Sequence, residues 1–278
     1  ENLSGGAGDD LIEQTNGQDF GGGVWFSHGH ANGGSGNDTI SGGAGADTIE
    51  GGAGNDRLYG NEGWLGTSGD SVDLLLGGAG NDCLYSLDGN RAEMVGGSGD
   101  DHYWVERAEA ITEAAGGGND KVTFVAINYF SNYFLPAEVE QLDIAFQFYG
   151  EPAGYLCVGR GNVLANLMQI SAGQGERATV LLDGRAGNDT LIGGNGDDFL
   201  AGGSGVDRLA AGNGSDWYEV DRVGDIVVET VSGHVGGVDT VDSTVSYRLG
   251  PNVENLWLLH GVGAINGFGN TLDNVIEA

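Results

Sequence analysis

The amino-acid sequence predicts an all-β protein, and within that class a right-handed parallel β-roll or β-helix solenoid. Three observations lead to this fold class. A nine-residue pattern GGxGxDxUx, in which U is a large apolar residue, recurs along the chain; glycine makes up 56 of the 278 residues; and the apolar residues fall at regular intervals. Roughly a dozen coils of about 4.8 Å each would stack to a length of ~60 Å.

Composition and charge exclude several classes of protein. The chain has 41 acidic and 10 basic residues and a formal net charge of -31, so nucleic acids and anionic membranes would repel it. No apolar run reaches the length of about 18 residues that a membrane-spanning helix needs. An acidic, glycine-rich composition is typical of disorder, yet 39% of the residues are apolar. We therefore expect a folded chain whose acidic groups are held together by a counterion.

Two further features are the pair of cysteines and the first residue of the chain. Cys83 and Cys157 are too few for a disulfide framework and lack the spacing of a zinc site, although a single disulfide between them stays open. The chain begins at Glu1 with neither a Met nor a signal peptide, which predicts a segment of a longer precursor. The cellular compartment therefore has to be inferred from the repeats.

The nonapeptides form two blocks. In the first block, copies such as GGSGNDTIS from Gly33 and GGAGNDRLY from Gly51 recur in phase. The second block has four consecutive copies, of which the first is GRAGNDTLI from Gly184. Because so many copies keep the same phase, the blocks are predicted to be repeated structural units.

The residue types of the nonapeptide point to a hard cation. Glycine at positions 1, 2 and 4 lets the backbone adopt positive φ and turn its carbonyl groups inward, and the aspartate at position 6 adds a carboxylate. Ca²⁺ prefers oxygen ligands of these two kinds from a flexible turn. The last three residues predict a short strand whose position-8 residue points inward. These position-8 residues are Ile12, Ile40, Ile49, Leu58, Leu84, Leu191, Leu200 and Leu209.

The pattern resembles that of the RTX (repeats-in-toxin) family of haemolysin-type calcium-binding repeats. The resemblance covers about residues 5–104 and 184–219, and it implies that two nonapeptides form one coil, with each calcium ion between turns 18 residues apart. About eight calcium ions are then expected. The implied ligands are Asp10, Gly33, Ser35, Asp38, Asp47, Gly52, Gly54, Asp56, Gly78, Gly80, Asp82, Asp101, Gly184, Ala186, Asp189, Gly193, Asn195, Asp198, Gly203, Gly205, Asp207, Gly212, Gly214 and Asp216.

The two edges of the first block are predicted to differ. Among the even-numbered turns only the one at Gly42 is regular, and two others contain inserted loops. Insertions in a solenoid map to loops on one face, which is often the binding face. We therefore expect one calcium-binding edge with room for about four ions, and one decorated edge. The odd-numbered turns, all intact, start at Gly5, Gly33, Gly51, Gly77 and Gly96.

The decorated edge supplies further candidates. Asp19 and Asp73 are additional candidate metal ligands, and Trp25 and Trp64 in the inserted loops are candidates for stacking on sugar rings. In the fourth even-numbered turn Arg91 is expected in place of the aspartate. Its guanidinium could offset negative charge where no calcium binds; the alternative is a solvated surface arginine.

The second block predicts two more calcium sites. Asp189 is paired with Asp207, and Asp198 with Asp216, each pair being 18 residues apart. The turns are consecutive and uninterrupted, so both edges of this block are expected to bind calcium.

A different unit separates and follows the blocks, and it also repeats. Residues 103–123 match 218–243, and the segments from Pro136 and Gly159 match those from Pro251 and Gly267. Alternating apolar residues such as Leu142, Ile144 and Phe146, and likewise Val253, Leu256 and Leu258, predict strands with one buried face, so that the solenoid continues on apolar packing. The aromatic residues between 124 and 149 are expected to form the core of the first spacer.

Two aspartates of the spacers follow glycine-rich turns. Asp120 and Asp239 could bind an extra ion, although an aspartate with a structural role in a turn is the alternative. We expect four parts in one continuous solenoid: RTX block 1 at residues 1–104, a spacer at 105–183, RTX block 2 at 184–217 and a second spacer at 218–278.

These features predict a function other than catalysis. The sequence has no HExxH, GxSxG or P-loop motif, and we expect no catalytic or cofactor-binding residues. We expect a calcium-binding structural or interaction module of a secreted or cell-surface bacterial protein, in a matrix, adhesin or filament-like assembly, that folds on calcium binding outside the cell. The resemblance implies Gram-negative type I secretion.

Two alternatives stay open. The chain could be the C-terminal folding and secretion module of a secreted hydrolase or toxin whose catalytic domain is elsewhere, or a glycan-binding module that uses the inserted loops. Residues 270–278 resemble 162–170, and residues 1–6 read as their continuation. This pattern favours head-to-tail self-association or a tandem array; the alternative is an arbitrary boundary of the segment with frayed ends.

Overall fold

The computed structural model describes residues 2–13, 29–43, 45–60, 72–87, 91–127, 130–146, 156–171, 178–230, 236–259 and 264–278. All regular secondary structure within these residues is β, and the strands pair in parallel, which confirms the predicted fold class. Nothing in these ranges forms a helix able to span a lipid bilayer. The chain divides into two compact units, residues 1–124 with 136–139 and residues 125–135 with 140–278, which we describe one at a time.

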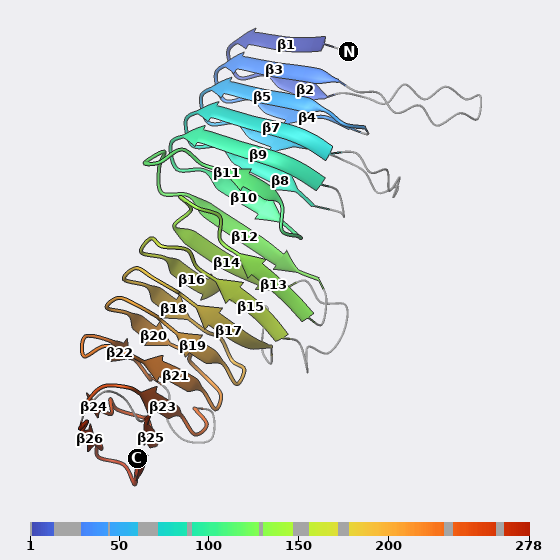
Figure 1. Ribbon diagram of the computed structural model, residues 1–278. Helices are drawn as coiled ribbons and strands as arrows, with labels where there is room; N and C mark the ends of the chain where they lie inside the picture. Colours follow the sequence, from blue (N-terminus) through green and yellow to red (C-terminus); the bar gives the residue numbers. More distant parts are fainter. Residues whose placement is uncertain are drawn as a thin grey trace. The chain divides into compact units, whose positions relative to one another are not determined.

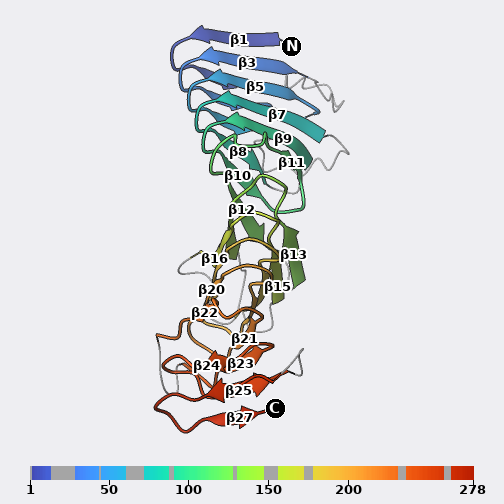
Figure 2. The ribbon, with the colours of Figure 1, turned by 60° about the vertical axis from the view of Figure 1, so that its left-hand side comes forward.

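Unit 1 consists of short strands that alternate between two sheets (Figures 1 and 2). One sheet has the order β1-β3-β5-β7-β9-β11, and the strands of the other pair in the order β2-β4-β6-β8-β10-β12. Each coil thus contributes one strand to each sheet. The strands are β1 (Asn2–Ala7), β2 (Leu11–Glu13), β3 (His30–Ser35), β4 (Thr39–Ser41), β5 (Thr48–Ala53), β6 (Arg57–Tyr59), β7 (Val72–Ala79), β8 (Cys83–Ser86), β9 (Arg91–Ser98), β10 (His102–Val105), β11 (Ala110–Thr112) and β12 (Lys121–Ala126). The last two residues of β12 belong to unit 2.

The register of unit 1 locates the inserted residues. Asp38 and Asp56 are 18 residues apart in neighbouring coils, whereas Asp10 and Asp38 are 28 apart and Asp56 and Asp82 are 26 apart. The extra residues fall within 14–28 and 61–71, which are outside the described residues. Both insertions lie in even-numbered turns, as the sequence predicts.

A column of buried apolar side chains runs through each sheet of unit 1. The position-8 residues Ile40, Leu58 and Leu84 lie in register on successive strands, and all three are fully buried. On the other sheet Ile49 pairs with Leu75, and both are also fully buried. Burial of such side chains is worth about 25 cal/mol per Å² of apolar surface, so these columns are the main apolar contribution to the coil.

The turns need glycine for two different reasons. Gly34 and Gly36, at positions 2 and 4, have φ angles of 105° and 129°, and the same positions are in the left-handed region in all five odd-numbered turns. Position 1 is different: Gly33 does not have positive φ, so the expectation for that position is wrong. A β-carbon at Gly33 would overlap the carboxylate of Asp38 and lie 2.7 Å from the carbonyl oxygen of Gly51. Position 1 is therefore glycine because the turn has no space for a side chain.

Unit 2 has the same construction. Its strands pair in the orders β14-β16-β18-β20-β22 and β13-β15-β17-β19-β21-β23-β25-β27, with β24 and β26 as a separate pair. The strands are β13 (Phe130–Phe134), β14 (Gln141–Phe146), β15 (Leu156–Arg160), β16 (Leu167–Ile170), β17 (Thr179–Asp183), β18 (Thr190–Ile192), β19 (Phe199–Ala201), β20 (Arg208–Ala210), β21 (Trp217–Val220), β22 (Ile226–Val227), β23 (Thr240–Ser243), β24 (Tyr247–Arg248), β25 (Asn255–Leu258), β26 (Gly267–Phe268) and β27 (Val275–Glu277).

The spacer strands bury the expected apolar face. Leu142, Ile144 and Phe146 on β14 are buried, and so are Val253, Leu256 and Leu258 in the second spacer. The expectation is wrong for two aromatic residues of β13, because Phe130 and Phe134 are 65% and 49% exposed. Strand alternation turns both rings outward, and the Arg160 guanidinium lies 4.9 Å from the centre of the Phe134 ring.

The two cysteines are free thiols in this fold, so the disulfide that the sequence leaves open is not formed. Cys157 is fully buried on β15, and burial raises the pKa of its thiol to about 12. Cys157 therefore has the character of a core residue.

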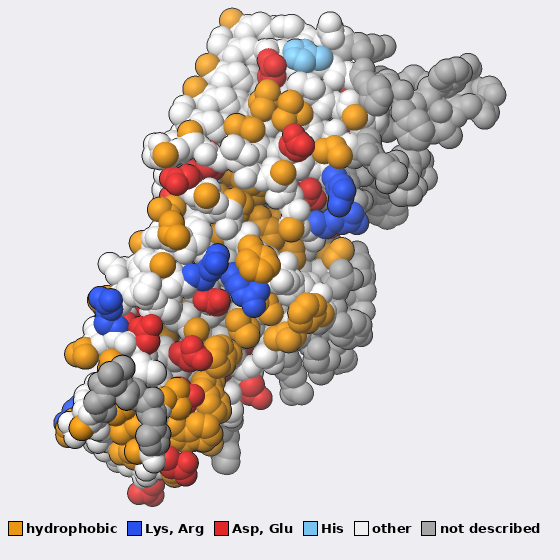
Figure 3. Space-filling model, in the orientation of Figure 1, with side chains coloured by type: hydrophobic (Ala, Val, Ile, Leu, Met, Phe, Trp, Pro, Cys, Tyr) orange, Lys and Arg blue, Asp and Glu red, His pale blue; other side chains and the backbone are white. Residues whose placement is uncertain are grey.

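Most aspartates at position 6 are buried. Asp38, Asp56, Asp82 and Asp101 in unit 1 are each 1% exposed. On the face drawn in Figure 3, acidic side chains are correspondingly scattered, although the chain has 41 acidic residues. The burial of these carboxylates is the feature that the functional site has to explain.

Replacing the buried Leu58 by alanine is predicted to destabilise the calcium-saturated protein by about 2–5 kcal/mol, because it removes buried apolar contacts and leaves a cavity. Urea denaturation in saturating calcium measures the change. Arg57, exposed beside it on β6, is the control, since Arg57→Ala should change stability by less than about 0.5 kcal/mol. Equal effects of the two substitutions would contradict the role of Leu58 in the core.

Candidate metal centres

A row of aspartates runs along the odd-numbered edge of unit 1. The backbone N–H of Asp38 donates to Oδ1 of Asp56 at 2.8 Å, and the N–H of Asp56 donates to Oδ1 of Asp82 at 2.8 Å. Because this bond recurs from coil to coil, it gives every carboxylate of the row the same orientation. The other bonds of the row join Asp10 to Asp38, Asp82 to Asp101 and Asp101 to Asp120.

The second oxygen of these carboxylates has no partner in the protein. Oδ2 is buried and makes no hydrogen bond in Asp10, Asp38, Asp56, Asp82 and Asp101. Burial raises the pKa of Asp82 and that of Asp101 to about 7, although the hydrogen bond from the preceding backbone N–H opposes the rise. Burying an ionised carboxylate without a counter-charge costs several kcal/mol. The row is therefore unfavourable at neutral pH unless a cation neutralises it.

The residues around these oxygens fit a calcium ion. Oδ2 of Asp38 and the carbonyl oxygen of Gly51, one coil further on, converge on the space that a β-carbon of Gly33 would fill. The carboxylate of Asp56 and the carbonyl oxygen of Gly77 converge in the same way in the next turn. Carboxylate and carbonyl oxygens are the ligands that calcium prefers, whereas softer transition metals favour nitrogen and sulfur.

The backbone ligands implied by the sequence lie in the same turns. The carbonyl oxygen of Ser35, at position 3, accepts the N–H of Gly8 in the preceding coil at 2.7 Å. The carbonyl oxygen of Gly52, at position 2, faces Gly78 of the following coil, where a β-carbon would overlap it. A carbonyl oxygen has two lone pairs, so the hydrogen bond of Ser35 leaves room for a metal contact. Calcium contacts to these carbonyl groups stay a prediction.

The even-numbered edge of unit 1 has a shorter row. The N–H of Gly29 donates to Oδ1 of Asp47 at 2.8 Å, and the N–H of Asp47 donates to Oδ1 of Asp73 at 3.0 Å. Asp73 thus occupies the position-6 place of the coil with the second insertion. Burial raises the pKa of Asp73 to about 7. The structure therefore continues the row with this candidate residue, and metal binding by Asp73 stays a prediction.

The row ends at the next coil. Ala92 lies in register with Asp73, so the expectation that Arg91 stands in the aspartate position is wrong by one residue. The N–H of Ala92 donates to Oε2 of Glu109 at 3.1 Å. Burial raises the pKa of Glu109, and the positive charges of Arg107 and Arg91 oppose that rise. The positive charge of Arg91 thus favours the ionised form of Glu109, at the coil where the row of aspartates stops.

Unit 2 contains both predicted pairs of the second block. The N–H of Asp189 donates to Oδ1 of Asp207, and the N–H of Asp198 donates to Oδ1 of Asp216, each at 2.8 Å. Oδ2 is buried without a partner in Asp189, Asp207 and Asp216. Asp198 differs, because its Oδ2 accepts the N–H of Gly194 at 2.8 Å. Three of the four aspartates therefore repeat the arrangement of unit 1.

The spacers contain an uncharged version of the turn. Asn166 stands in the position-6 place, and its N–H donates to Oδ1 of Asp189 at 2.7 Å. In the second spacer Nδ2 of Asn274 donates to the carbonyl oxygens of Val253 at 3.1 Å and Glu254 at 3.2 Å. The amide N–H is a neutral donor that places a partial positive charge beside the converging carbonyl oxygens. At an aspartate turn a bound cation would fill this role. These turns can close without a metal.

A second ladder runs beside the aspartates and was not predicted. The position-5 side chains are exposed, and the N–H of Asn55 donates to Oδ1 of Asn37 at 2.7 Å while the N–H of Asn81 donates to Oδ1 of Asn55 at 2.8 Å. The direction is opposite to that of the position-6 row, where the earlier coil donates. The frequent Asn and Asp at position 5, as in GNDT and GNDR, is the signal that could have indicated it.

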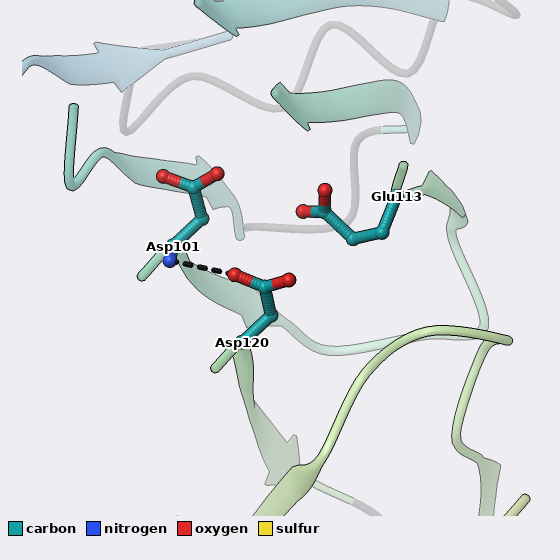
Figure 4. A group of neighbouring side chains, drawn as sticks. All are labelled: Asp101, Glu113 and Asp120. Atoms are coloured by element: carbon teal, nitrogen blue, oxygen red, sulfur yellow. Dashed lines mark hydrogen bonds between the residues drawn. The ribbon is translucent and has the colours of Figure 1, made fainter. Parts of the chain in front are cut away.

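Sequence reasoning also missed two glutamates. Glu113 lies near Asp101 and Asp120, and one oxygen of each carboxylate is within 4.8 Å of the others (Figure 4). The equivalent group in unit 2 is Asp216, Glu229 and Asp239. The recurrence of Glu at matching places of the two spacers was visible in the sequence. Three other candidates, Asp19, Trp25 and Trp64, lie outside the described residues.

The raised pKa values predict how the calcium-free protein responds to pH. An aspartate with a pKa near 3.8 when unfolded and about 7 when folded, such as Asp82 or Asp189, binds protons more tightly in the folded state. Its contribution to stability is fully present below the unfolded pKa and is lost as pH rises through about 7. Calcium-free protein should therefore gain β structure when the pH falls from 8 to 5, as measured by circular dichroism. Loss of β structure on acidification would contradict the cited pKa shifts.

The aspartate and asparagine turns predict opposite effects of exchanging the two residues. Asp56→Asn should keep the Oδ1 hydrogen bond, remove a buried charge and stabilise the calcium-free form while lowering calcium affinity. Asn166→Asp should destabilise the calcium-free form by about 1–3 kcal/mol, because it removes donors from buried acceptors and adds a charge. Thermal unfolding with and without calcium checks both, and equal effects of the two exchanges would refute the comparison.

Comparison with known proteins agrees with this geometry. A family model described as the RTX calcium-binding nonapeptide repeat matches residues 1–20, 32–63, 67–91 and 183–218, in four copies. Neither curated proteins nor solved structures gave a match to the chain. The matched family is a calcium-binding structural repeat, and it indicates no enzymatic activity. The matched segments contain aspartate rows of both units, so both units carry RTX calcium-binding nonapeptide repeats.

Proposed function

We propose that the chain is a calcium-folded structural or interaction module of a secreted or cell-surface bacterial protein, in a matrix, adhesin or filament-like assembly. The observation that carries the proposal is the row of buried aspartates, such as Asp38, Asp56 and Asp82, whose Oδ2 atoms have no partner in the protein. RTX repeats are typical of secreted proteins. Extracellular calcium modules have dissociation constants of about 10⁻⁴ to 10⁻³ M, so such a module would fold after export.

The residues of the chain explain why folding would require the ion. In the calcium-free chain, acidic side chains repel one another and the glycines lose much conformational entropy on folding. Calcium supplies the positive charge that the rows lack, and its binding energy becomes folding energy. About eight divalent ions would offset about half of the formal charge of -31.

The mode of export and the partner are part of the proposal. Type I secretion suits a chain that stays unfolded at low calcium and folds outside. Head-to-tail association of copies, or of tandem units, stays a prediction, as does the alternative of a folding module attached to a catalytic domain. The glycan-binding alternative depends on Trp25 and Trp64, which the structure does not describe.

A calcium titration of the chain tests the proposal. We expect a transition from coil to β structure near millimolar calcium, measured by circular dichroism and reversed by a chelator, because the position-6 charges must be neutralised for the turns to close. Light scattering on the same samples tests association of copies. Magnesium at equal ionic strength is the control and should be much less effective, since it demands octahedral geometry. A β signal that survives the chelator unchanged would refute calcium-dependent folding.

A further inference from the structure

A glutamate from the spacer lies beside the row of aspartates at the end of each block. In unit 2, Glu229 follows β22 and lies beside Asp216 and Asp239, which precede β21 and β23. One oxygen of each of the three carboxylates lies within 4.8 Å of the others, and all three residues are buried. Three acidic groups are thus held close together by three separate segments of the chain.

Two oxygens in this group have no partner in the protein. Asp216 is 1% exposed and Glu229 is 6% exposed, and neither Oδ2 of Asp216 nor Oε2 of Glu229 makes a hydrogen bond. The remaining oxygens show that the side chains are nevertheless fixed. Oδ1 of Asp216 accepts the N–H of Asp198 at 2.8 Å, and Oε1 of Glu229 accepts the hydroxyl of Tyr218. The unpartnered oxygens are therefore oriented by the fold.

Among the described residues, no positive side chain contributes to the pKa of Asp216 or to that of Asp239. Burial raises the pKa of each to about 8, and every charged neighbour that contributes to the two shifts is another acid, including Glu229 and Glu254. Fully buried Tyr218 holds Glu229 in place, and burial raises the pKa of its hydroxyl, so it is an uncharged donor. A cation is the component that this arrangement lacks.

The same group occurs independently in unit 1. Asp101, Glu113 and Asp120 approach one another from the ends of different strands, with the N–H of Asp101 donating to Oδ1 of Asp120 at 2.8 Å (Figure 4). The hydroxyl of Tyr103 donates to Oε1 of Glu113, as that of Tyr218 does to Glu229. Oδ2 of Asp101 is buried without a hydrogen bond. Two separate spacers thus produce one arrangement.

We propose that each group is a three-carboxylate calcium site, distinct from the turn sites, and that these two sites bind calcium more tightly than the turns do. The inference rests on the proposed calcium-binding function. Hard oxygen donors favour Ca²⁺, and affinity rises with the number of charged ligands. A turn site combines its aspartates with backbone carbonyls, whereas Glu113 and Glu229 add a third carboxylate. The two glutamates are therefore the residues that distinguish the junction sites.

Calcium binding to the full chain, measured by equilibrium dialysis and calorimetry, tests the assignment. The test variant is Glu113→Gln with Glu229→Gln, which keeps an oxygen to accept the tyrosine hydroxyl but removes the charge. The control is Glu93→Gln with Glu219→Gln, two glutamates exposed on β9 and β21. Wild type and control should bind two ions at concentrations on the order of tenfold lower than the rest.

The test variant should lose this tight class and still fold at high calcium. Each single variant should lose one tight ion, which keeps the test valid if the double variant does not fold. Terbium gives a second readout, because an ion at either site would lie near Tyr103 or Tyr218, and tyrosine-sensitised emission at the first two equivalents should disappear with the glutamate charges. Unchanged tight binding in the single variants would overturn the inference while leaving calcium-dependent folding intact; absence of calcium binding by the wild type would overturn both.

Discussion

The structure depends on a mismatch between one donor and two acceptors in most coils of the aspartate rows. The backbone offers a single N–H to a position-6 carboxylate such as that of Asp56, which accepts the N–H of Asp38, and the second oxygen is buried without a hydrogen bond. Since the arrangement repeats along the row, the unmet charge accumulates with each coil. The described residues thus leave these buried carboxylates without a counter-charge, and this is the basis for the proposal that a divalent ion completes the fold.

The same backbone geometry can also be closed without an ion. At Asn274 the amide nitrogen donates to two carbonyl oxygens, so the turn carries its own positive partner and needs no metal. Blocks with aspartate therefore alternate with coils whose stability comes from asparagine and from apolar side chains such as Leu142 and Leu256. From this division we expect the spacers to hold structure at calcium concentrations at which the blocks do not.

Much of this organisation could be predicted from the sequence, because the repeat fixes it locally. The nonapeptide pattern indicates the parallel coils, the buried position-8 residues such as Leu58, and the aspartate pairs of both blocks, since each depends on spacing within nine or eighteen residues. The position of Asp73 after an insertion could also be predicted, because the odd-numbered edge stays regular and fixes the register of the coils. Short-range periodicity was therefore a sound guide to the calcium blocks.

What could not be predicted depends on contacts between coils. Position 1 is glycine for lack of space beside Asp38 and the next coil, and periodicity alone does not separate that reason from positive φ. The outward rings of Phe130 and Phe134 follow from the phase of a strand whose limits the sequence does not mark. Glu113 and Glu229 reach the rows from spacer segments without the nonapeptide, so the repeated Glu is visible in the sequence but its approach to the aspartates is revealed by three-dimensional proximity.

The opposite directions of the position-5 and position-6 ladders have a consequence for how such a chain can change length in evolution. Every coil accepts a bond from each neighbour and donates one to each neighbour, so a coil of 18 residues can be duplicated or deleted and both ladders rejoin. Gain of a single nonapeptide would instead move every later turn to the opposite edge. During evolution the chain is therefore expected to lengthen or shorten in steps of two nonapeptides. Other insertions should be confined to loops that leave the register of the coils unchanged.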